Sequence, residues 1–229
     1  MELLVSPSSL EEARNSLAAD IIDVKRPAEG SLGANFPWVI RDIKKLAGDK
    51  PVSAAVGDYD YKPGSASLSA LGAAHAGADY IKLGLMFSGK ERAREVIRSM
   101  TRAVKDEFPE KNVVFAAYSD YERLGTINPM DISDLVAEAG GDVAMIDTGI
   151  KDGRTTFEFM DENQLITFTE QNQDLGLKTA LAGSLRFEDV KPLKRINPEI
   201  IGVRGMVCGG DRSDTVREDL VLKAIELFR

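Results

Sequence analysis

Short apolar runs alternate with longer amphipathic segments along the whole chain. The apolar runs have the length of buried strands, and the segments between them place apolar residues three or four positions apart, as one face of a helix does. The segment Lys90–Glu107 is the clearest helix, because it carries a regular apolar stripe. The stripe consists of Ala93, Val96, Ile97, Met100 and Val104. The pattern therefore predicts strands and helices in alternation.

Eight strand–helix pairs account for the sequence. In chain order they are Leu3–Ser6 with a helix carrying Leu10, Ala13 and Leu17; Ile21–Lys25 with a helix within Phe36–Leu46; Val52–Val56 with Ala66–Ala76; Tyr80–Leu85 with Lys90–Glu107; Val113–Tyr118 with Ile132–Ala139; Val143–Asp147 with Glu162–Asp174; Lys178–Leu181 with Phe187–Arg195; and Ile200–Val203 with Val216–Phe228. This count predicts an α/β protein with a closed parallel (β/α)₈ barrel, in a single domain over residues 1–229. A doubly wound open sheet is the alternative, but eight full units in 229 residues favour closure.

Composition limits the function more than the fold. The net charge of −8 argues against binding to nucleic acid or to an acidic membrane, although a local pocket on such a protein can still hold a small anion. Cys208 is the only cysteine, and the N-terminus lacks the basic start and apolar stretch of a secretion signal. We therefore expect a cytoplasmic protein that does not enter a membrane. Its oligomeric state stays open, and a homo-oligomer is compatible with the sequence.

Charged residues stand near the ends of three predicted strands that should otherwise be apolar. They are Asp23, Lys25, Lys82 and Asp147, with Lys151 in the loop that follows. Alternate strands contribute to the same layer of a barrel interior, and active sites of this fold lie at the C-terminal strand ends, so these groups are expected to converge. A buried lysine beside another ammonium has a lowered pKa and becomes a nucleophile for carbonyl groups. The other interpretation is a set of structural ion pairs at the barrel rim.

Loops after the seventh and eighth strands are rich in glycine. Such loops often hold phosphate in this fold, because glycine lets backbone N–H groups approach a ligand closely. The candidates are Gly183, Ser184, Gly209 and Gly210, with Arg204 or Arg212 as a charged contact. Glycines are also common in plain turns, so this pattern has weight only together with the barrel.

The remaining candidates point to no further chemistry. His75 lies in an Ala/Gly-rich helix and is expected to pack or face solvent, and Trp38 is expected to pack. One histidine and one cysteine far apart do not make a zinc site, and Cys208 has no histidine to activate it. No phosphate-binding loop of the nucleoside triphosphatases is present. The sequence predicts neither a metal nor a cofactor.

Several segments resemble one known family. IIDVKRPAEGSLGANFPWVI over residues 21–40 is similar to the (5-formylfuran-3-yl)methyl phosphate synthases of methanofuran biosynthesis. LLVSP at the start, DYIKLGL around Lys82 and MIDTGIKDGRTTF around Lys151 resemble the same family, so the resemblance runs essentially from end to end.

The resemblance implies a (β/α)₈ lyase that needs no organic cofactor. Such an enzyme condenses two molecules of glyceraldehyde 3-phosphate to the furan aldehyde phosphate, with loss of phosphate and water. By resemblance, Lys25 in the DVK motif is the Schiff-base lysine and Lys82 in the IKLG motif is the proton acceptor. Asp23, Asp147 and Lys151 match further active-site positions of the family.

Two other functions stay open at this point. One is a different lysine-dependent aldolase that acts on a single sugar phosphate, and the product formed from glyceraldehyde 3-phosphate alone distinguishes it. The other is a non-catalytic phosphosugar-binding barrel, which would form no imine that borohydride could trap.

Overall fold

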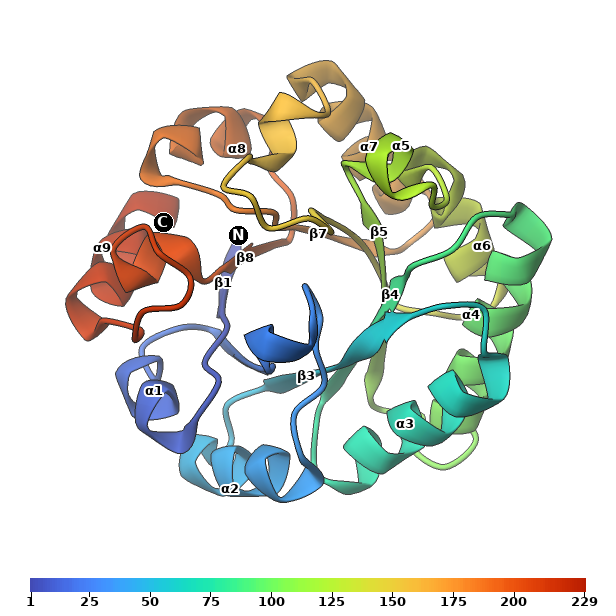
Figure 1. The fold of residues 1–229 in the computed structure, drawn as a ribbon, viewed down its shortest axis with the longest axis horizontal. Helices are drawn as coiled ribbons and strands as arrows, with labels where there is room; N and C mark the ends of the chain where they lie inside the picture. The colour runs from blue at the N-terminus through green and yellow to red at the C-terminus, as the bar shows by residue number, and fades with distance from the viewer.

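Eight parallel strands close into a barrel in the computed structural model, which describes residues 1–229. They follow one another around the barrel in chain order, and β1 pairs with β8, with Leu4 beside Gly202 (Figure 1). The strands are β1 (Glu2–Val5), β2 (Ile21–Val24), β3 (Val52–Tyr59), β4 (Tyr80–Leu85), β5 (Asn112–Tyr118), β6 (Val143–Asp147), β7 (Lys178–Leu181) and β8 (Ile200–Val203). This confirms the predicted (β/α)₈ fold, because a doubly wound sheet would leave two unpaired edges.

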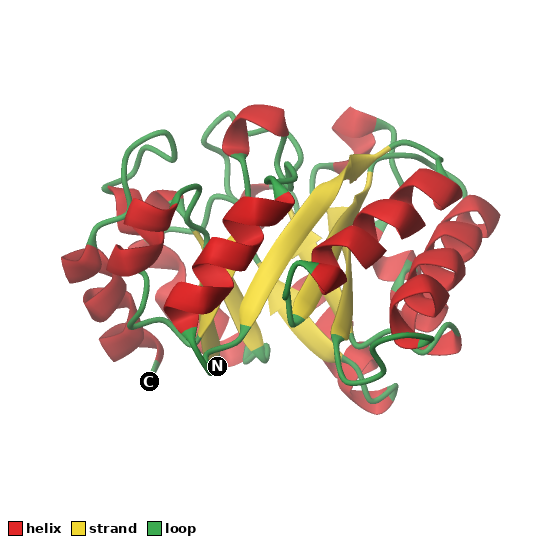
Figure 2. Cartoon of the chain, turned by 90° about the horizontal axis from the view of Figure 1, so that it is seen from below, coloured by secondary structure: helices red, strands yellow, loops and turns green.

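Helices cover the outside of the barrel, and both chain termini lie at the same end of it (Figure 2). The α-helices are α1 (Leu10–Asn15), α2 (Pro37–Ala47), α3 (Pro63–His75), α4 (Lys90–Lys105), α5 (Tyr121–Leu124), α6 (Ser133–Glu138), α7 (Glu162–Asp174), α8 (Val190–Ile196) and α9 (Glu218–Phe228). Short 3₁₀ turns are η1 (Pro27–Glu29), η2 (Pro129–Asp131), η3 (Thr156–Glu158), η4 (Phe187–Asp189) and η5 (Gly205–Cys208). None of the helices combines the length and hydrophobicity that crossing a bilayer requires.

Some element boundaries differ from the predicted ones. Strand β3 continues past its predicted end to Tyr59, because a bulge between Ala55 and Gly57 lets its pairing with β4 resume. Lys25 lies just beyond β2 rather than within it. The predicted helix over Phe187–Arg195 is divided into η4 and α8.

Apolar side chains fill the barrel as well as the space outside it. One cluster of 54 buried residues lies mainly between strands and helices and includes the predicted stripe of α4. A second cluster of 12 residues fills the barrel interior. Eleven of the twelve come from strands or from residues next to them, and Leu32 comes from the loop between β2 and α2. Packed side chains thus fill the centre, so that polar chemistry is confined to the end layers.

Carboxylates repeat at the N-terminal end of the barrel, just before every second strand. Each accepts the backbone N–H of a residue at the start of the preceding strand, at 2.7–2.8 Å. The four pairs are Asp20 with Leu3, Asp79 with Val52, Asp142 with Val113, and Glu199 with Thr179. These bonds satisfy N–H groups that the ladder leaves free at the strand starts, so this end is built for stability.

Candidate active site

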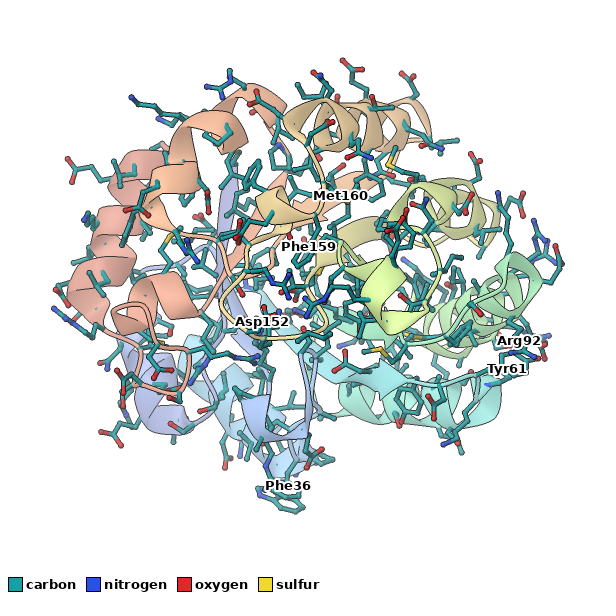
Figure 3. The ribbon with its side chains drawn as sticks, turned by 45° about the horizontal axis from the view of Figure 1, so that its top comes forward. Phe36, Tyr61, Arg92, Asp152, Phe159 and Met160 are labelled. Atoms are coloured by element: carbon teal, nitrogen blue, oxygen red, sulfur yellow. The ribbon has the colours of Figure 1, made fainter.

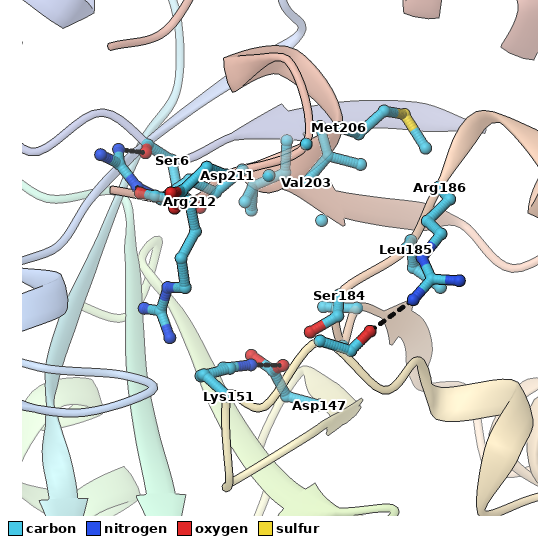
Figure 4. Close-up of a pocket in the computed structure, with 18 of the residues that line it drawn as sticks. Ser6, Asp147, Lys151, Ser184, Leu185, Arg186, Val203, Met206, Asp211 and Arg212 are labelled. Carbon is cyan, nitrogen blue, oxygen red and sulfur yellow. Dashed lines mark hydrogen bonds and ion pairs between the residues drawn. The ribbon is translucent and has the colours of Figure 1, made fainter. Parts of the chain in front are cut away.

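A cavity of about 760 Å³ opens at the C-terminal ends of the strands. Strands β1, β4, β6 and β8 line it, together with Lys25 just after β2 and the loops that follow β6, β7 and β8 (Figure 4). Lys25, Lys82, Asp147 and Lys151 line it, as do all the predicted phosphate-loop residues. Neither β3 nor β5, nor the segment that follows either strand, contributes a residue to its lining. The cavity is therefore displaced toward one side of the barrel mouth.

Asp23 and Lys82 form a buried ion pair across the barrel interior. The Lys82 ammonium lies 2.9 Å from both carboxylate oxygens of Asp23, and the two side chains are at most 2% exposed. The Ser6 hydroxyl donates a third hydrogen bond to Asp23 at 2.8 Å. Burial alone would raise the pKa of Asp23, but the neighbouring lysine charges outweigh it and hold that pKa below its usual value. Ser6 was not predicted as a site residue, and its only signal in the sequence is its position at the end of the first apolar run.

Asp147 and Lys151 form a second pair at the end of β6. The Lys151 ammonium lies 2.6 Å from Asp147 Oδ1 and 2.9 Å from the Thr148 hydroxyl. The same carboxylate oxygen accepts the backbone N–H of Thr148 at 2.7 Å. Burial opposes ionisation of Asp147, yet the charges of Lys151 and Lys25 keep its pKa below the usual value. Four positions separate the two partners, so the loop folds back to bring the ammonium over the strand end.

Lys25 has no partner of its own, although it lies between these two pairs. Its side chain is buried, with the residue only 7% exposed, and its ammonium makes no hydrogen bond to the protein. Burial lowers the pKa of Lys25 to about 7. Asp147 and Asp23 act to raise that pKa, while Lys82 and Lys151 act to lower it. Near pH 7 a large fraction of this amine is therefore unprotonated and nucleophilic.

The loops after β7 and β8 have unusual backbone conformations at the cavity. Gly183 and Ser184 have φ angles of 102° and 51°, and Gly209 and Gly210 have φ angles of 82° and 109°. Ser184 is one of two non-glycine residues with a positive φ, a conformation that costs free energy and is concentrated at functional sites. A side chain at position 183 would collide with Thr156, so glycine is required there. Such backbone turns expose N–H groups to an anion.

Arg204 lies at the cavity but is already fully engaged. Its guanidinium binds Glu12 at 2.9 and 3.2 Å, and its other contacts are backbone oxygens. These oxygens belong to Ser6, Arg212 and Asp214, at 2.7, 2.7 and 3.4 Å. The predicted phosphate contact by Arg204 would require breaking bonds in a buried ion pair, which is costly. We therefore assign Arg204 to holding the loop after β8 against α1.

Arg212 is the cation that this loop leaves free. Its side chain extends into the cavity and faces Asp147 and Lys151 (Figure 4). One guanidinium nitrogen, Nη2, is buried and has no hydrogen-bond partner. Burial lowers the pKa of Arg212 from its usual value, while Asp147 acts to raise it. A guanidinium stays charged in proteins, so Arg212 presents a desolvated cation with unused donors to whatever occupies the cavity.

The residues to which the sequence analysis assigned no chemistry either lie away from the cavity or are unreactive. His75 is exposed beside Glu107, at 3.1 Å. Cys208 is buried, which raises its pKa to about 11 and keeps the thiol protonated. Trp38 was expected to pack, and it does so at the surface rather than in the interior. It is 57% exposed and stacks on Phe36, which projects from the edge of the molecule (Figure 3), because α2 begins there with its first turn facing solvent.

Comparison with known proteins is consistent along the whole chain. The family model described as 4-HFC-P synthase matches residues 3–225. The chain is 57% identical over 229 residues to the (5-formylfuran-3-yl)methyl phosphate synthase of Methanosarcina mazei, with 98% of each chain covered. It is 49% identical over 235 residues to the protein of the same name from Methanocaldococcus jannaschii, with both chains fully covered.

Solved structures of lower identity share the fold. The 3-hexulose-6-phosphate synthase of Salmonella typhimurium superimposes with a TM-score of 0.71 at 20% identity, covering 100% of this chain and 98% of that one. Orotidine 5′-monophosphate decarboxylase of Methanocaldococcus jannaschii gives a TM-score of 0.71 at 15% identity, with the same coverage. At this identity the likeness shows the barrel alone, whereas the family is established by the full-length match at 47–57% identity. The chain belongs to the 4-HFC-P synthase family.

Proposed function

We propose that this enzyme is a cytoplasmic lyase that condenses two molecules of glyceraldehyde 3-phosphate into (5-formylfuran-3-yl)methyl phosphate, through an imine on Lys25. The observation that carries the proposal is the surplus amine: three buried or half-buried lysines lie with two aspartates, and only Lys25 is left without a partner. A carbonyl substrate would find one nucleophile there, already largely neutral near pH 7.

The charge of the cavity supports an anionic substrate. Although the protein carries a net charge of −8, basic residues predominate in the cavity lining. The basic residues are Lys25, Lys82, Lys151, Arg186, Arg204, Arg212 and Arg217, against the acidic residues Asp147, Glu188 and Asp211. We assign one substrate phosphate to the backbone N–H groups of Gly183, Ser184, Gly209 and Gly210, with Arg212 as the charged donor.

The paired lysines suit the steps after imine formation. One of the two glyceraldehyde 3-phosphate molecules first isomerises to its ketone form, with no gain or loss of atoms, and Lys25 captures this ketone with loss of water. The imine nitrogen then draws electrons from the adjacent C–H bond. The Lys82 ammonium first transfers a proton to Asp23, whose two carboxylate oxygens both bind it. The neutral Lys82 amine then accepts the proton from the C–H bond. The resulting enamine adds to the aldehyde of the second triose phosphate and forms the new carbon–carbon bond.

Ring closure, hydrolysis of the bond to Lys25 and elimination complete the furan ring. Loss of one phosphate and two molecules of water balances two triose phosphates against the aromatic product. Lys151 lies beside Asp147 at the cavity wall, where it can neutralise a departing phosphate or donate a proton to a departing hydroxyl. Asp147 holds that ammonium in place, which is the role we assign to it.

Mass spectrometry of the product formed from glyceraldehyde 3-phosphate alone tests the proposal. We expect the furan aldehyde phosphate together with free inorganic phosphate. A hexose bisphosphate without phosphate release would indicate a reversible aldolase instead. Unchanged substrate, with no mass added to the protein after borohydride treatment, would leave a phosphosugar-binding barrel and overturn the proposal.

A further inference from the structure

The segment that follows Lys25 folds back over the barrel mouth. Residues Arg26–Gly33, here called the mouth loop, are closed at the base by a hydrogen bond from Arg26 N–H to the Gly33 carbonyl at 2.8 Å. Figure 1 shows this segment in blue, with η1, inside the ring of strands. Its Leu32 side chain is fully buried and belongs to the cluster that fills the barrel interior. The mouth loop therefore closes part of the barrel end.

Two polar groups at the strand ends hold the mouth loop from one side. Both carboxylate oxygens of Asp58, in β3, accept the backbone N–H of Leu32, at 3.2 and 3.0 Å. The hydroxyl of Tyr118, at the end of β5, donates to Asp58. On the other side, the Ser31 hydroxyl donates to the Thr148 carbonyl after β6, at 2.8 Å. The mouth loop thus spans from β3 and β5 to β6.

Glycines make this arrangement sterically possible. A side chain at Gly84, in β4, would lie 2.7 Å from Asp58 Oδ1 and would collide with the Tyr118 hydroxyl. A side chain at Gly30 would collide with the other oxygen of Asp58, and its φ of 139° disfavours any other residue. Tyr118 is fully buried, although nothing in the proposed chemistry uses it. These features point to a site built around the Asp58–Tyr118 contact.

The position of the mouth loop explains the shape of the cavity. Because the loop and its anchors occupy the mouth over β3 and β5, the cavity is lined only from other strands and from the segments that follow them. We propose that Asp58 and Tyr118 are positioning residues: they hold the mouth loop in place, exclude water from the Lys25 amine and leave a single open side through which the substrates enter. This inference rests on the proposed role of Lys25 as the imine-forming amine.

The strongest charge effects on Lys25 come from groups other than the two anchors. Asp23, Lys82, Asp147 and Lys151 act on the amine by charge, but burial is the largest cause of its lowered pKa. If the mouth loop is loosened, water reaches the amine and its pKa should rise from about 7 toward the value of 10.5 for an exposed lysine. Two neutral substitutions, Tyr118→Phe and Ser31→Ala, loosen the loop without changing any charge.

Competitive acetylation measures the titration of Lys25 without substrate. The protein is labelled with a trace of acetic anhydride across a pH series, and the Lys25 peptide is quantified by mass spectrometry. We expect half-maximal labelling near pH 7 in the wild type and about one pH unit higher in Tyr118→Phe, which is about fivefold less neutral amine at pH 7. The same variant should show the acidic limb of its pH–activity profile moved by the same amount and its activity largely rescued at pH 9.

A neighbouring tyrosine supplies the matched control. Tyr59→Phe also removes one hydroxyl and its hydrogen bond, to Ser69 at 2.6 Å, but away from the mouth loop. It should leave the titration of Lys25 unchanged. Wild-type titration in Tyr118→Phe with an intact thermal transition, or an equal shift in Tyr59→Phe, overturns the inference. If Tyr118→Phe does not fold, Ser31→Ala decides, with a shift in the same direction expected.

The two proposals fail separately in this experiment. If the wild-type protein makes no furan product, the proposed function is wrong, and the acetylation series still reports whether the mouth loop controls the amine. If product forms but the titration does not move in the variants, only the positioning role of Asp58 and Tyr118 is wrong.

Discussion

The two ends of the barrel carry the same kinds of charged side chain in different surroundings. At the N-terminal end, Asp79 binds the Lys44 ammonium at 2.8 Å and Asp142 binds that of Lys105 at 2.9 Å, and all four side chains are partly exposed. At the C-terminal end, Asp23 and Lys82 are almost completely buried. Lys25 is buried beside them with no carboxylate of its own.

Burial and the number of hydrogen-bond partners decide whether such residues serve stability or chemistry. An ion pair that water can reach contributes little free energy and leaves ordinary chemistry at both partners. A buried group with an incomplete set of partners keeps an altered pKa and unused hydrogen-bonding capacity, which are the properties of a reactive site. The C-terminal end therefore differs from the N-terminal end by its unpartnered groups, the Lys25 amine and one Arg212 donor, and not by its number of charges.

Removal of Lys25 should have the largest effect. Lys25→Ala is expected to abolish both turnover and borohydride trapping, because no other unpaired amine lies in the cavity near the strand ends. Since Lys25 has no direct partner, its loss leaves no carboxylate without a counter-ion, and the fold should persist. Lys105→Ala, at the opposite end, should retain wild-type turnover. Trapping that persists at Lys82 or Lys151 in the Lys25 variant would contradict the assignment.

Removal of Lys82 should separate imine formation from the following step. Lys82→Ala should still be trapped by borohydride at Lys25 but should lose about 10²- to 10⁴-fold in turnover, the usual contribution of a positioned acid–base group. Solvent deuterium exchange at the carbon next to the imine reports the missing step directly. Exchange at the wild-type rate would make Lys151 the leading candidate for the base.

This variant also requires a stability control. Asp23 is fully buried and would lose its counter-ion, at a cost of about 3–5 kcal/mol. Thermal unfolding of Lys82→Ala therefore has to show a folded population at the assay temperature before the kinetics are compared. Lys25 is close enough to act on Asp23 by charge, which should reduce the loss of stability.

The sequence predicted the features that periodicity controls. Alternation of strand and helix defined the barrel, and the positions of Asp23, Lys82 and Asp147 near the ends of even-numbered strands indicated that they meet. A strand projects successive side chains to opposite faces, so the spacing of residues carries this information directly. The pairing of partners within the cluster depends on side-chain geometry, which spacing does not contain.

The features that periodicity does not control were missed or left open. The sequence allowed Arg204 or Arg212 as the phosphate contact and favoured Arg204. The structure distinguishes them because Glu12, 192 positions away from Arg204, engages Arg204. The mouth loop has no regular pattern, and Asp58 lies past a bulge, beyond the predicted end of its strand. Contacts between loops over a barrel mouth arise from tertiary packing, so no local sequence pattern predicts them.

Truncation of Arg212 should weaken substrate binding more than catalysis. Arg212→Ala removes a desolvated guanidinium that we place on a substrate phosphate, and hydrogen bonds to charged groups contribute about 1.5–3 kcal/mol each. We expect KM for the triose phosphate to rise about 10- to 100-fold, with kcat reduced less. Arg217→Ala is the matched control, because that side chain also lines the cavity but is exposed and paired with Asp219 at 2.7 Å. Equal effects in the two variants would remove Arg212 from the phosphate site.

The smallest effect should come from the N-terminal end of the barrel. Asp79→Ala deletes the acceptor of the Val52 N–H and the partner of Lys44. Val52 is fully buried, so its orphaned N–H should cost about 1–3 kcal/mol, while the loss of the half-exposed ion pair adds little. For a protein of this size each kcal/mol lowers Tm by about 2–4 °C, which calorimetry resolves.

Asp49→Ala, an exposed change nearby, should leave Tm unaltered. Turnover per folded molecule should be unchanged in both variants, because no cavity residue touches this end. A fall in turnover with Asp79→Ala would show that the two ends of the barrel are coupled, and the division between a stabilising end and a reactive end would then fail.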